Sequence, residues 1–341
     1  MVRERRYHRA VPPWTPDQDR FPRFPLFDEP SPLAPLSRFE AVLGGRAEIW
    51  IKREDLLPLA FGGNKIRSLE YLIGAALAEN ADCLVTTGRR WSNHARLTAA
   101  AGARAGLEVH LVLSGPPTVP PNPGVALDAL LGATIHQTAT ADRADRTALL
   151  ERVVADLRTA GRRPSMIATG GASVTGAIGQ VMAGLELLAD GAMRSIAFDD
   201  VVVPSATGGT QAGLLVGVRT GGSAMTVHGL AVAPADELRT AVTGLVVGLG
   251  GVPGLTTVPN ADIVVDGTQL GDGYGVPSEA ALEATRLLAR TEGILVDPIY
   301  TAKALAGLIA LVRSGRLDGR RVVFWHAGGT PGLFEPLASR G

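Results

Sequence analysis

The sequence predicts an α/β protein built from parallel sheets covered by helices on both faces. Short apolar runs typical of strands alternate along the chain with segments whose apolar residues recur at helical spacing. The chain has 341 residues, 46% hydrophobic and 19% charged, so it can bury a large core and form about two domains. Its glycine clusters follow predicted strands, at the edge where such folds bind ligands.

The first elements set the pattern. The first 45 residues carry many prolines and few periodic stretches, so we expect them to wrap irregularly over a domain surface. Residues 47–55 then alternate apolar and polar side chains as a strand does, and residues 66–80 repeat apolar residues at helical spacing. The series continues with strands expected at 83–88, 108–115 and 134–138, each before a helix expected at 93–106, 124–133 and 145–161.

The second half of the chain repeats the same alternation. Ser278 is well placed to cap a helix that begins at Glu279. Strands are expected at 199–203, 226–234 and 293–300, before helices at 210–220, 235–248 and 301–315, and a strand at 320–329 ends the series.

Composition excludes several classes of function. The net charge is zero without a basic stripe, which argues against nucleic acid, and no apolar run is long enough to span a membrane. The N-terminus lacks the apolar segment of a signal peptide, and the single cysteine, Cys83, reads as a core residue, so we expect a cytoplasmic protein. The six histidines are scattered, so we expect no metal site.

Two strand ends offer groups that could bind anions. Thr207, Gly208, Gly209 and Thr210 lie between a strand and a helix, where converging amides and hydroxyls would cradle a phosphate; the alternative is a tight turn without a ligand. Ser92, Asn93 and His94 open another helix and could grip a carboxylate or a phenolate. The alternatives there are ordinary capping by Ser92 or Asn93, and packing of His94.

Further candidates stand at the C-terminal side of the chain. Tyr274 lies between glycines in a loop, and Tyr300 ends a predicted strand, where it could also be a core tyrosine with one hydrogen bond. Gly328, Gly329 and Thr330 end the last strand, and the glycine pair suits close approach to a planar ligand.

Lys65 is the most unusual of these residues. The chain has 33 Lys and Arg residues, but its only lysines are Lys52, Lys65 and Lys303. Lys65 follows Gly62-Gly63-Asn64 directly and precedes a predicted helix. Unlike arginine, lysine can lose its proton near neutral pH when it is desolvated, and its amine can then form an imine.

Together these segments resemble the pyridoxal-phosphate (PLP) enzymes that include D-cysteine desulfhydrase and 1-aminocyclopropane-1-carboxylate (ACC) deaminase. The likeness covers roughly residues 40–337. It implies the tryptophan-synthase-β-like fold (fold type II), with two open, twisted, mostly parallel sheets flanked by helices. The segments that carry it are "GGNKIRSLEYL", "SNHAR", "TGGTQAG", "GYGVPSE", "LARTEGILVDPIYTAKALAG" and "HAGGTPGLF".

The resemblance implies a role for each matching residue. Lys65 would form the Schiff base with PLP and shuttle protons, Asn93 would bond the phenolic oxygen, and Thr207 to Thr210 would hold the phosphate. Ser92 and His94 would grip the substrate carboxylate. The substrate face would be lined by Trp91, Tyr274 and Tyr300, with Ser92, Tyr274 and Tyr300 counted among the catalytic residues.

The family likeness also implies a domain layout and an assembly. Residues 1–65 and 176–341 would form a large PLP-binding domain, and residues 66–175 a small domain inserted in it. The protein would be a homodimer that acts on a small amino acid.

The sequence departs from the deaminase pattern at the cofactor nitrogen. That branch has a glutamate after the tyrosine of its "PVYE" motif, whereas this chain has Thr301, as desulfhydrase-like members do. Thr330 is then the better candidate for a neutral hydrogen bond to the pyridine nitrogen. A neutral partner leaves the ring a weaker electron sink, which suits β-elimination better than the opening of a cyclopropane.

A second departure lies before Ser92. The family usually reads Gly-Gly-x-Gln there, and this chain reads Gly88-Arg89-Arg90-Trp91. One interpretation is a reshaped pocket for an anionic or bulkier substrate, such as a sulfonate; the other is outward arginines and a packing tryptophan.

These features favour a PLP-dependent lyase that eliminates a β-substituent and yields a 2-oxo acid and ammonia, as D-cysteine desulfhydrase does. The alternatives are an ACC deaminase and a PLP-binding protein without turnover.

Overall fold

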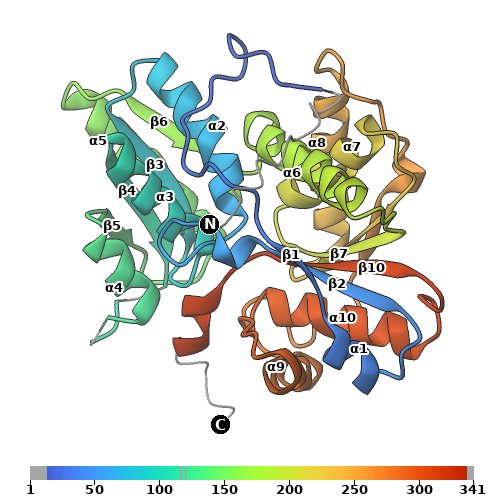
Figure 1. Cartoon of the computed structure of the whole chain (residues 1–341). Helices are drawn as coiled ribbons and strands as arrows, with labels where there is room; N and C mark the ends of the chain where they lie inside the picture. Colours follow the sequence, from blue (N-terminus) through green and yellow to red (C-terminus); the bar gives the residue numbers. More distant parts are fainter. Residues whose placement is uncertain (1–13, 116, 120, 336–341) are drawn as a thin grey trace, which may run out of the picture.

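The larger of two sheets in the described residues has six strands. The computed structural model describes residues 14–115, 117–119 and 121–335, and Figure 1 shows two sheets with helices around them. The large sheet has the order β1-β2-β10-β7-β8-β9, in which β1 is antiparallel to β2 and all other pairs are parallel. Its strands are β1 (Leu33–Pro35), β2 (Glu48–Arg53), β7 (Asp200–Ser205), β8 (Thr226–Ala231), β9 (Val264–Asp266) and β10 (Arg321–His326).

Helices cover both faces of the large sheet because its strands are apolar on both sides. Val201 and Val203 of β7 face one cluster of core residues, and Val202 between them faces another. The first face carries α6 (Val174–Met193), α7 (Gly209–Thr220) and α8 (Ala235–Gly250); the second carries α1 (Ser37–Val42), α9 (Glu279–Glu292) and α10 (Thr301–Arg313).

The small sheet is fully parallel, with the order β5-β4-β3-β6. Leu111 and Leu113 of β4 pack toward α3, and Val112 packs toward α5, so this sheet too is covered on both faces. Its elements are β3 (Cys83–Arg89), β4 (Glu108–Ser114), β5 (Thr134–Gln137), β6 (Pro164–Ile167), α3 (Asn93–Ala105), α4 (Pro123–Leu130) and α5 (Arg143–Thr159).

Helix α2 (Lys65–Ala78) lies between the two sheets (Figure 1). Ile66, Leu69 and Ile73 pack into the core of the small sheet. The helix also packs against α6 of the large sheet. The N-terminus of α2 therefore lies where the two sheets meet.

The two-sheet α/β architecture confirms the expected fold class. One expected strand is wrong: residues 293–300 form no strand, because the carboxylate of Asp297 accepts three backbone amides and closes a turn. The first 45 residues are not wholly irregular, since they form β1 and α1. The expectations for residues 1–13 lie outside the described residues, and the domain boundaries remain a prediction.

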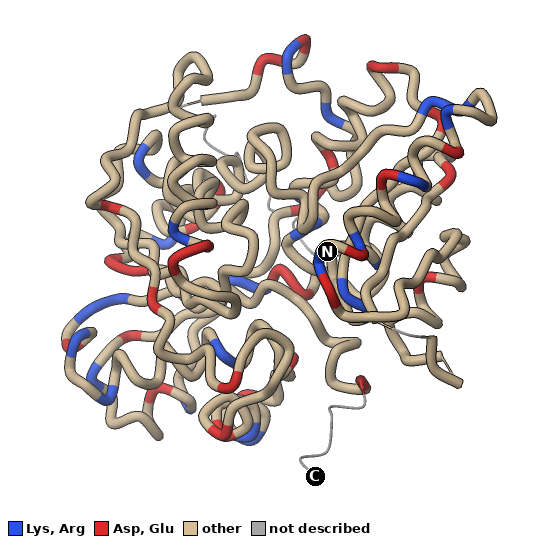
Figure 2. The backbone as a smooth tube through the Cα atoms, turned by 180° about the vertical axis from the view of Figure 1, so that it is seen from behind, with Lys and Arg blue, Asp and Glu red and all other residues tan. Residues whose placement is uncertain are grey.

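Charges are mixed along the chain. Figure 2 shows Lys and Arg interspersed with Asp and Glu over the described backbone. None of the helices in the described ranges is long and apolar enough to cross a membrane. Cys83 is buried in β3, as expected of a core residue.

Candidate functional site

A tight turn presents Lys65 at the first position of α2. Gly62 and Gly63 have φ of +66° and +130°, and a Cβ on Gly62 would lie 2.1 Å from the backbone oxygen of Asp55. The amide of Asn64 donates to the carbonyl oxygen of Ala327 at 3.0 Å. The turn before Lys65 is therefore fixed against the end of β10.

The amine of Lys65 differs from those of the other two lysines. Lys52 donates to Ser31 O and Glu186 Oε1, both at 2.7 Å, and Lys303 donates to the carbonyls of residues 270 and 273. The Lys65 amine has no hydrogen bond or ion pair within the described residues. Burial lowers the pKa of Lys65 to about 8. A large share of this amine can therefore be neutral and reactive just above physiological pH.

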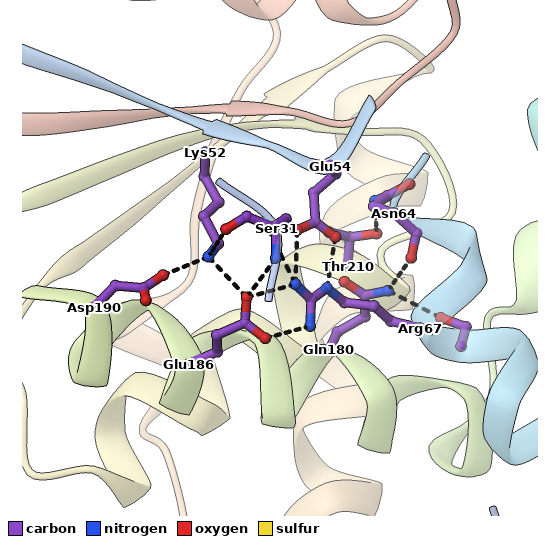
Figure 3. Close-up of polar contacts among 10 residues, drawn as sticks. Ser31, Lys52, Glu54, Asn64, Arg67, Gln180, Glu186, Asp190 and Thr210 are labelled. Atoms are coloured by element: carbon purple, nitrogen blue, oxygen red, sulfur yellow. Dashed lines mark hydrogen bonds and ion pairs between the residues drawn. The ribbon is translucent and has the colours of Figure 1, made fainter. Parts of the chain in front are cut away.

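A buried ionic network holds α2 in place (Figure 3). Arg67, two residues after Lys65, donates to Glu54 Oε2 at 2.6 Å and to Glu186 Oε1 at 2.9 Å. Lys52 pairs with Glu186 and with Asp190 at 2.5 Å. The network joins β2, α2 and α6, so it fixes the helix that carries Lys65 against the large sheet.

Polar contacts connect the Lys65 turn to the start of α7 (Figure 3). Asn64 Nδ2 donates to Thr210 Oγ1 at 2.8 Å, and Gln180 Nε2 donates to Asn64 O at 2.8 Å. The two segments were predicted as separate candidates, and Asn64 is the residue that joins them.

The loop before α7 has the geometry of an anion cradle. Gly208 has φ of +83° and caps the helix, and the first helical hydrogen bond runs from Ala212 N to Gly208 O at 2.9 Å. The amides of residues 209–211 precede that bond, so they lack helical acceptors and point out of the helix N-terminus. A Cβ on Gly170 would lie 2.5 Å from Thr207 Oγ1, so η2 (Thr169–Gly171) packs against this loop.

The start of α3 packs against η2, the same segment that contacts the loop before α7. Ser92 Oγ accepts from Ala95 N at 3.2 Å, so Ser92 is the N-cap of the helix. A Cβ on Gly171 would lie 3.5 Å from His94 Cε1, which places His94 next to η2. Asn93 Oδ1 accepts from Arg96 Nη2 at 3.2 Å, which leaves the Asn93 amide nitrogen available as a donor.

His94 is neutral and presents a free acceptor. Burial, and then the charge of Lys65, lower its pKa to about 3. Thr86 Oγ1 donates to Ile167 O at 2.9 Å, so it accepts the proton of His94 Nε2 at 3.0 Å. His94 Nδ1 is buried, has no partner within the described part of the chain, and carries a lone pair. This atom is suited to accept a hydrogen bond, not to donate one to a carboxylate.

Tyr274 and Tyr300 are brought together. Their hydroxyl oxygens lie 2.5 Å apart, and their rings meet edge to face. Asp297 accepts the amide of Tyr300 at 2.7 Å, and Lys303 holds the loop of Tyr274. Burial raises the pKa of both hydroxyls, so both are protonated at neutral pH. One proton makes the bond between them, and the other is left for a further acceptor.

Thr301 and Thr330 differ in burial and in hydrogen bonding. Thr301 is fully buried, and its hydroxyl donates to Gly328 O at 2.9 Å, which ties α10 to the loop after β10. Thr330 begins η4 (Thr330–Phe334) and is only half-buried.

Trp91 and Arg89 belong to the tyrosine side of the site. A Cβ on Gly275 would lie 2.7 Å from Trp91 Cζ2, so the indole packs on the loop of Tyr274. The guanidinium carbon of Arg89 lies 5.9 Å from the centre of the Tyr274 ring. Sequence reasoning missed Arg146, which affects the same tyrosine from the first turn of α5.

The chain matches a family of known proteins and resembles two named relatives over most of its length. The model of the family "Pyridoxal-phosphate dependent enzyme" matches residues 25–328. An ACC deaminase of Burkholderia vietnamiensis is 38% identical over 92% of this chain and 96% of its own length. A D-cysteine desulfhydrase of Salmonella schwarzengrund is 40% identical over the same shares of the two chains.

Solved structures of related proteins have the same fold. A crystal structure of an ACC deaminase homologue superposes with a TM-score of 0.84 and 33% identity, covering 93% of this chain and 94% of that one. A serine racemase from Dictyostelium discoideum has a TM-score of 0.62 at 19% identity, covering 88% and 92%, and supports the fold alone. The expected fold type II architecture is confirmed.

Proposed function

The chain belongs to the family of pyridoxal-phosphate dependent enzymes, and from this premise we propose that it catalyses β-elimination on a small amino acid. The products would be a 2-oxo acid, ammonia and the released β-substituent. The observation that carries the proposal is the Lys65 amine with lowered pKa, fixed by Asn64 beside the amide-lined start of α7.

The residues of the site fit the cofactor. The amides of residues 209–211, with the hydroxyls of Thr207 and Thr210, would hold the phosphate at a helix N-terminus. The free amide nitrogen of Asn93 would donate to the phenolic oxygen, and Thr330 would face the pyridine nitrogen. The amine of Lys65 would bind the carbonyl carbon of the cofactor.

The chain's own groups would control the chemistry. When bound, PLP withdraws electrons from the substrate α-carbon. Lys65 would take the α-proton, because its amine is neutral above a pKa of about 8. The α3 N-terminus with Ser92 would orient the substrate carboxylate, and the Tyr274–Tyr300 pair would donate a proton to the leaving group. His94 Nδ1 would accept a hydrogen bond from a donor on the ligand.

Elimination is favoured over ring opening by the surroundings of the cofactor nitrogen. The two named relatives are similarly close, at 38% and 40% identity, so identity does not separate them. Thr301 stands where the deaminase pattern has glutamate, and its hydroxyl is already donated to Gly328 O. Thr330 is then the candidate partner of the pyridine nitrogen. Because it is neutral, it would leave the cofactor ring a weaker electron sink, which suits loss of a good β-leaving group.

A substrate panel tests the proposed reaction. The PLP-loaded protein should release pyruvate from β-substituted alanines with thiol, chloro, sulfonate or phosphate groups in at least one enantiomer. Release of 2-oxobutyrate from 1-aminocyclopropane-1-carboxylate should be at least about tenfold slower, a difference of about 1.4 kcal/mol in barrier. The reverse order would favour the deaminase, and cofactor binding with no turnover of any substrate would favour a protein without lyase activity.

Uptake of PLP should depend on pH through Lys65. The amine reacts with a carbonyl only when it is neutral, so the uptake rate should rise about tenfold per pH unit below its pKa and level off above about 8. His94 is neutral over this range and should add no inflection. Stopped-flow absorbance of the apo-protein mixed with PLP from pH 6 to 10 measures this. A rate that still climbs at pH 10 would mean an ordinary exposed lysine.

We also infer a cytoplasmic homodimer. The single cysteine, buried and unpaired, supports a reducing compartment, and the family likeness supports the dimer. Sedimentation velocity at micromolar concentration should give one species of twice the chain mass.

A further inference from the structure

Arg89, Arg90 and Arg146 form a cationic cluster beside the tyrosine pair. All three side chains are partly buried. None of them pairs with a carboxylate in the part of the chain that the structure describes, whereas other partly buried arginines do. Arg53, for example, binds Asp55 at 2.6 Å, and Arg219 binds Asp262 at 2.8 Å.

The cluster converges on Tyr274. Arg89 stacks on its ring at 5.9 Å, and Arg146, which donates to Ser114 Oγ at 2.9 Å, comes from the first turn of α5. The charges of both arginines lower the pKa of the Tyr274 hydroxyl. Arg89 therefore lies against the Tyr274 ring, and Arg146 binds the residue that pairs with Arg89 in the small sheet, Ser114.

Arg90 and Trp91 add further donors beside Tyr274. The guanidinium carbon of Arg90 lies 5.2 Å from the centre of the Trp91 ring. Arg90 Nε is buried without a hydrogen-bond partner among the described residues. Trp91 Nε1 lies close to the hydroxyls of Tyr274 and Tyr300, and its donor character lowers the pKa of both. Buried donors without acceptors are rare in folded proteins because each loses its hydration without compensation.

The cluster is costly without an anion. Burial, and then the charge of Arg89, lower the pKa of Arg146, and the groups that affect it include no carboxylate. An anion between Arg89 and Arg146 would offset the repulsion and accept charge-assisted hydrogen bonds. Guanidinium groups suit sulfonate, phosphate and carboxylate because they present paired donors.

We propose that Arg89 and Arg146 bind a second anionic group on the substrate, which is an amino acid with a sulfonate or phosphate as its β-substituent. The inference rests on the proposed function, because it names the substrate class of that reaction. Arg90 and Trp91 shape the wall of this subsite. The first carboxylate of the substrate binds at the α3 N-terminus.

The reaction balances for such a substrate. Lys65 takes the α-proton, the bond from Cβ to the substituent breaks, and the substituent leaves with its electron pair as sulfite or phosphate. Hydrolysis of the released enamine by one water gives pyruvate and ammonia. The reaction is redox-neutral, so it needs no oxidant or reductant.

Kinetic selectivity tests the subsite. For wild type, kcat/KM for cysteate or O-phosphoserine should exceed that for β-chloroalanine, whose β-substituent is uncharged. In Arg89→Gln and Arg146→Gln, the ratio of anionic to neutral kcat/KM should fall by roughly 10–100-fold, the range for loss of a charged hydrogen bond. Arg158→Gln, in the last turn of α5, should leave both values within twofold.

Binding separates this inference from the proposed function. Calorimetry of the PLP-loaded protein should show aspartate, which has a second carboxylate and no leaving group, binding more tightly than alanine. The double variant R89Q/R146Q should lose that preference. Turnover of β-chloroalanine without any preference for anionic ligands overturns the subsite. Preference for aspartate without turnover of any substrate leaves the subsite standing and overturns the elimination.

Discussion

Replacing Lys65 by alanine should lower turnover by at least about 10³-fold, because one amine both binds the cofactor and moves the α-proton. The variant should fold normally, since the Lys65 amine makes no hydrogen bond or ion pair within the described residues. The measurement is pyruvate release under single-turnover conditions, with circular dichroism as the check on folding.

Lys65→Arg is the matched control for charge. It keeps a cation at the start of α2, but a guanidinium stays protonated and cannot form an imine. It should be as inactive as the alanine variant. Activity within tenfold of wild type in either variant would show that Lys65 neither holds the cofactor nor transfers the proton.

Replacing Glu186 by leucine should destabilise the protein by about 3–5 kcal/mol, the usual effect of removing one partner from a buried ionic network. Glu186 accepts from both Lys52 and Arg67, and all three side chains are nearly inaccessible to water. The leucine leaves two buried cations with fewer acceptors. The free energy of unfolding from urea titration at pH 7 measures the loss.

The loss of stability in Glu186→Leu should depend on pH. Burial alone would raise the pKa of Glu186, but Arg67 and Lys52 together lower it well below its usual range. Its stabilising effect is therefore complete above the unfolded pKa of about 4.3 and lost as pH falls through the lower, folded pKa. The difference between wild type and Glu186→Leu should shrink in acid.

The control for Glu186→Leu is an exposed ion pair. Glu283→Gln breaks the Glu283–Arg313 pair between α9 and α10, both of whose side chains are more than half exposed. It should cost less than about 1 kcal/mol because solvent screens the pair. Equal losses in the two variants would show that the buried network contributes no special stability.

Local patterns predicted most of the fold. Strand–helix alternation indicated the parallel sheets and most of their helices, because the central strands of the large sheet are buried on both faces. Residues 293–300 misled because Leu295, Val296 and Ile299 look like a strand, while Asp297 closes a turn with its own side chain. The sequence analysis did not predict helix α6. Its residues Glu186 and Asp190 complete the buried network.

The site was predicted as segments and not as contacts. Motifs pointed to Lys65, the loop before α7 and the two tyrosines, because each stands at a strand end or a helix start. Asn64 and Arg146 were missed, since what they do depends on segments distant in sequence. Nothing in the local pattern around Arg146 indicates that it donates to Ser114 of β4 or that its charge acts on Tyr274.

Peptide mapping after borohydride reduction tests the central claim most directly. The chain has only three lysines, so the site of a reduced PLP adduct is unambiguous by mass spectrometry. We expect one pyridoxyl group per chain, on the peptide that contains Lys65. An adduct on Lys52 or Lys303, or no adduct after saturation with PLP, would contradict the assignment of Lys65 as the residue that holds the cofactor.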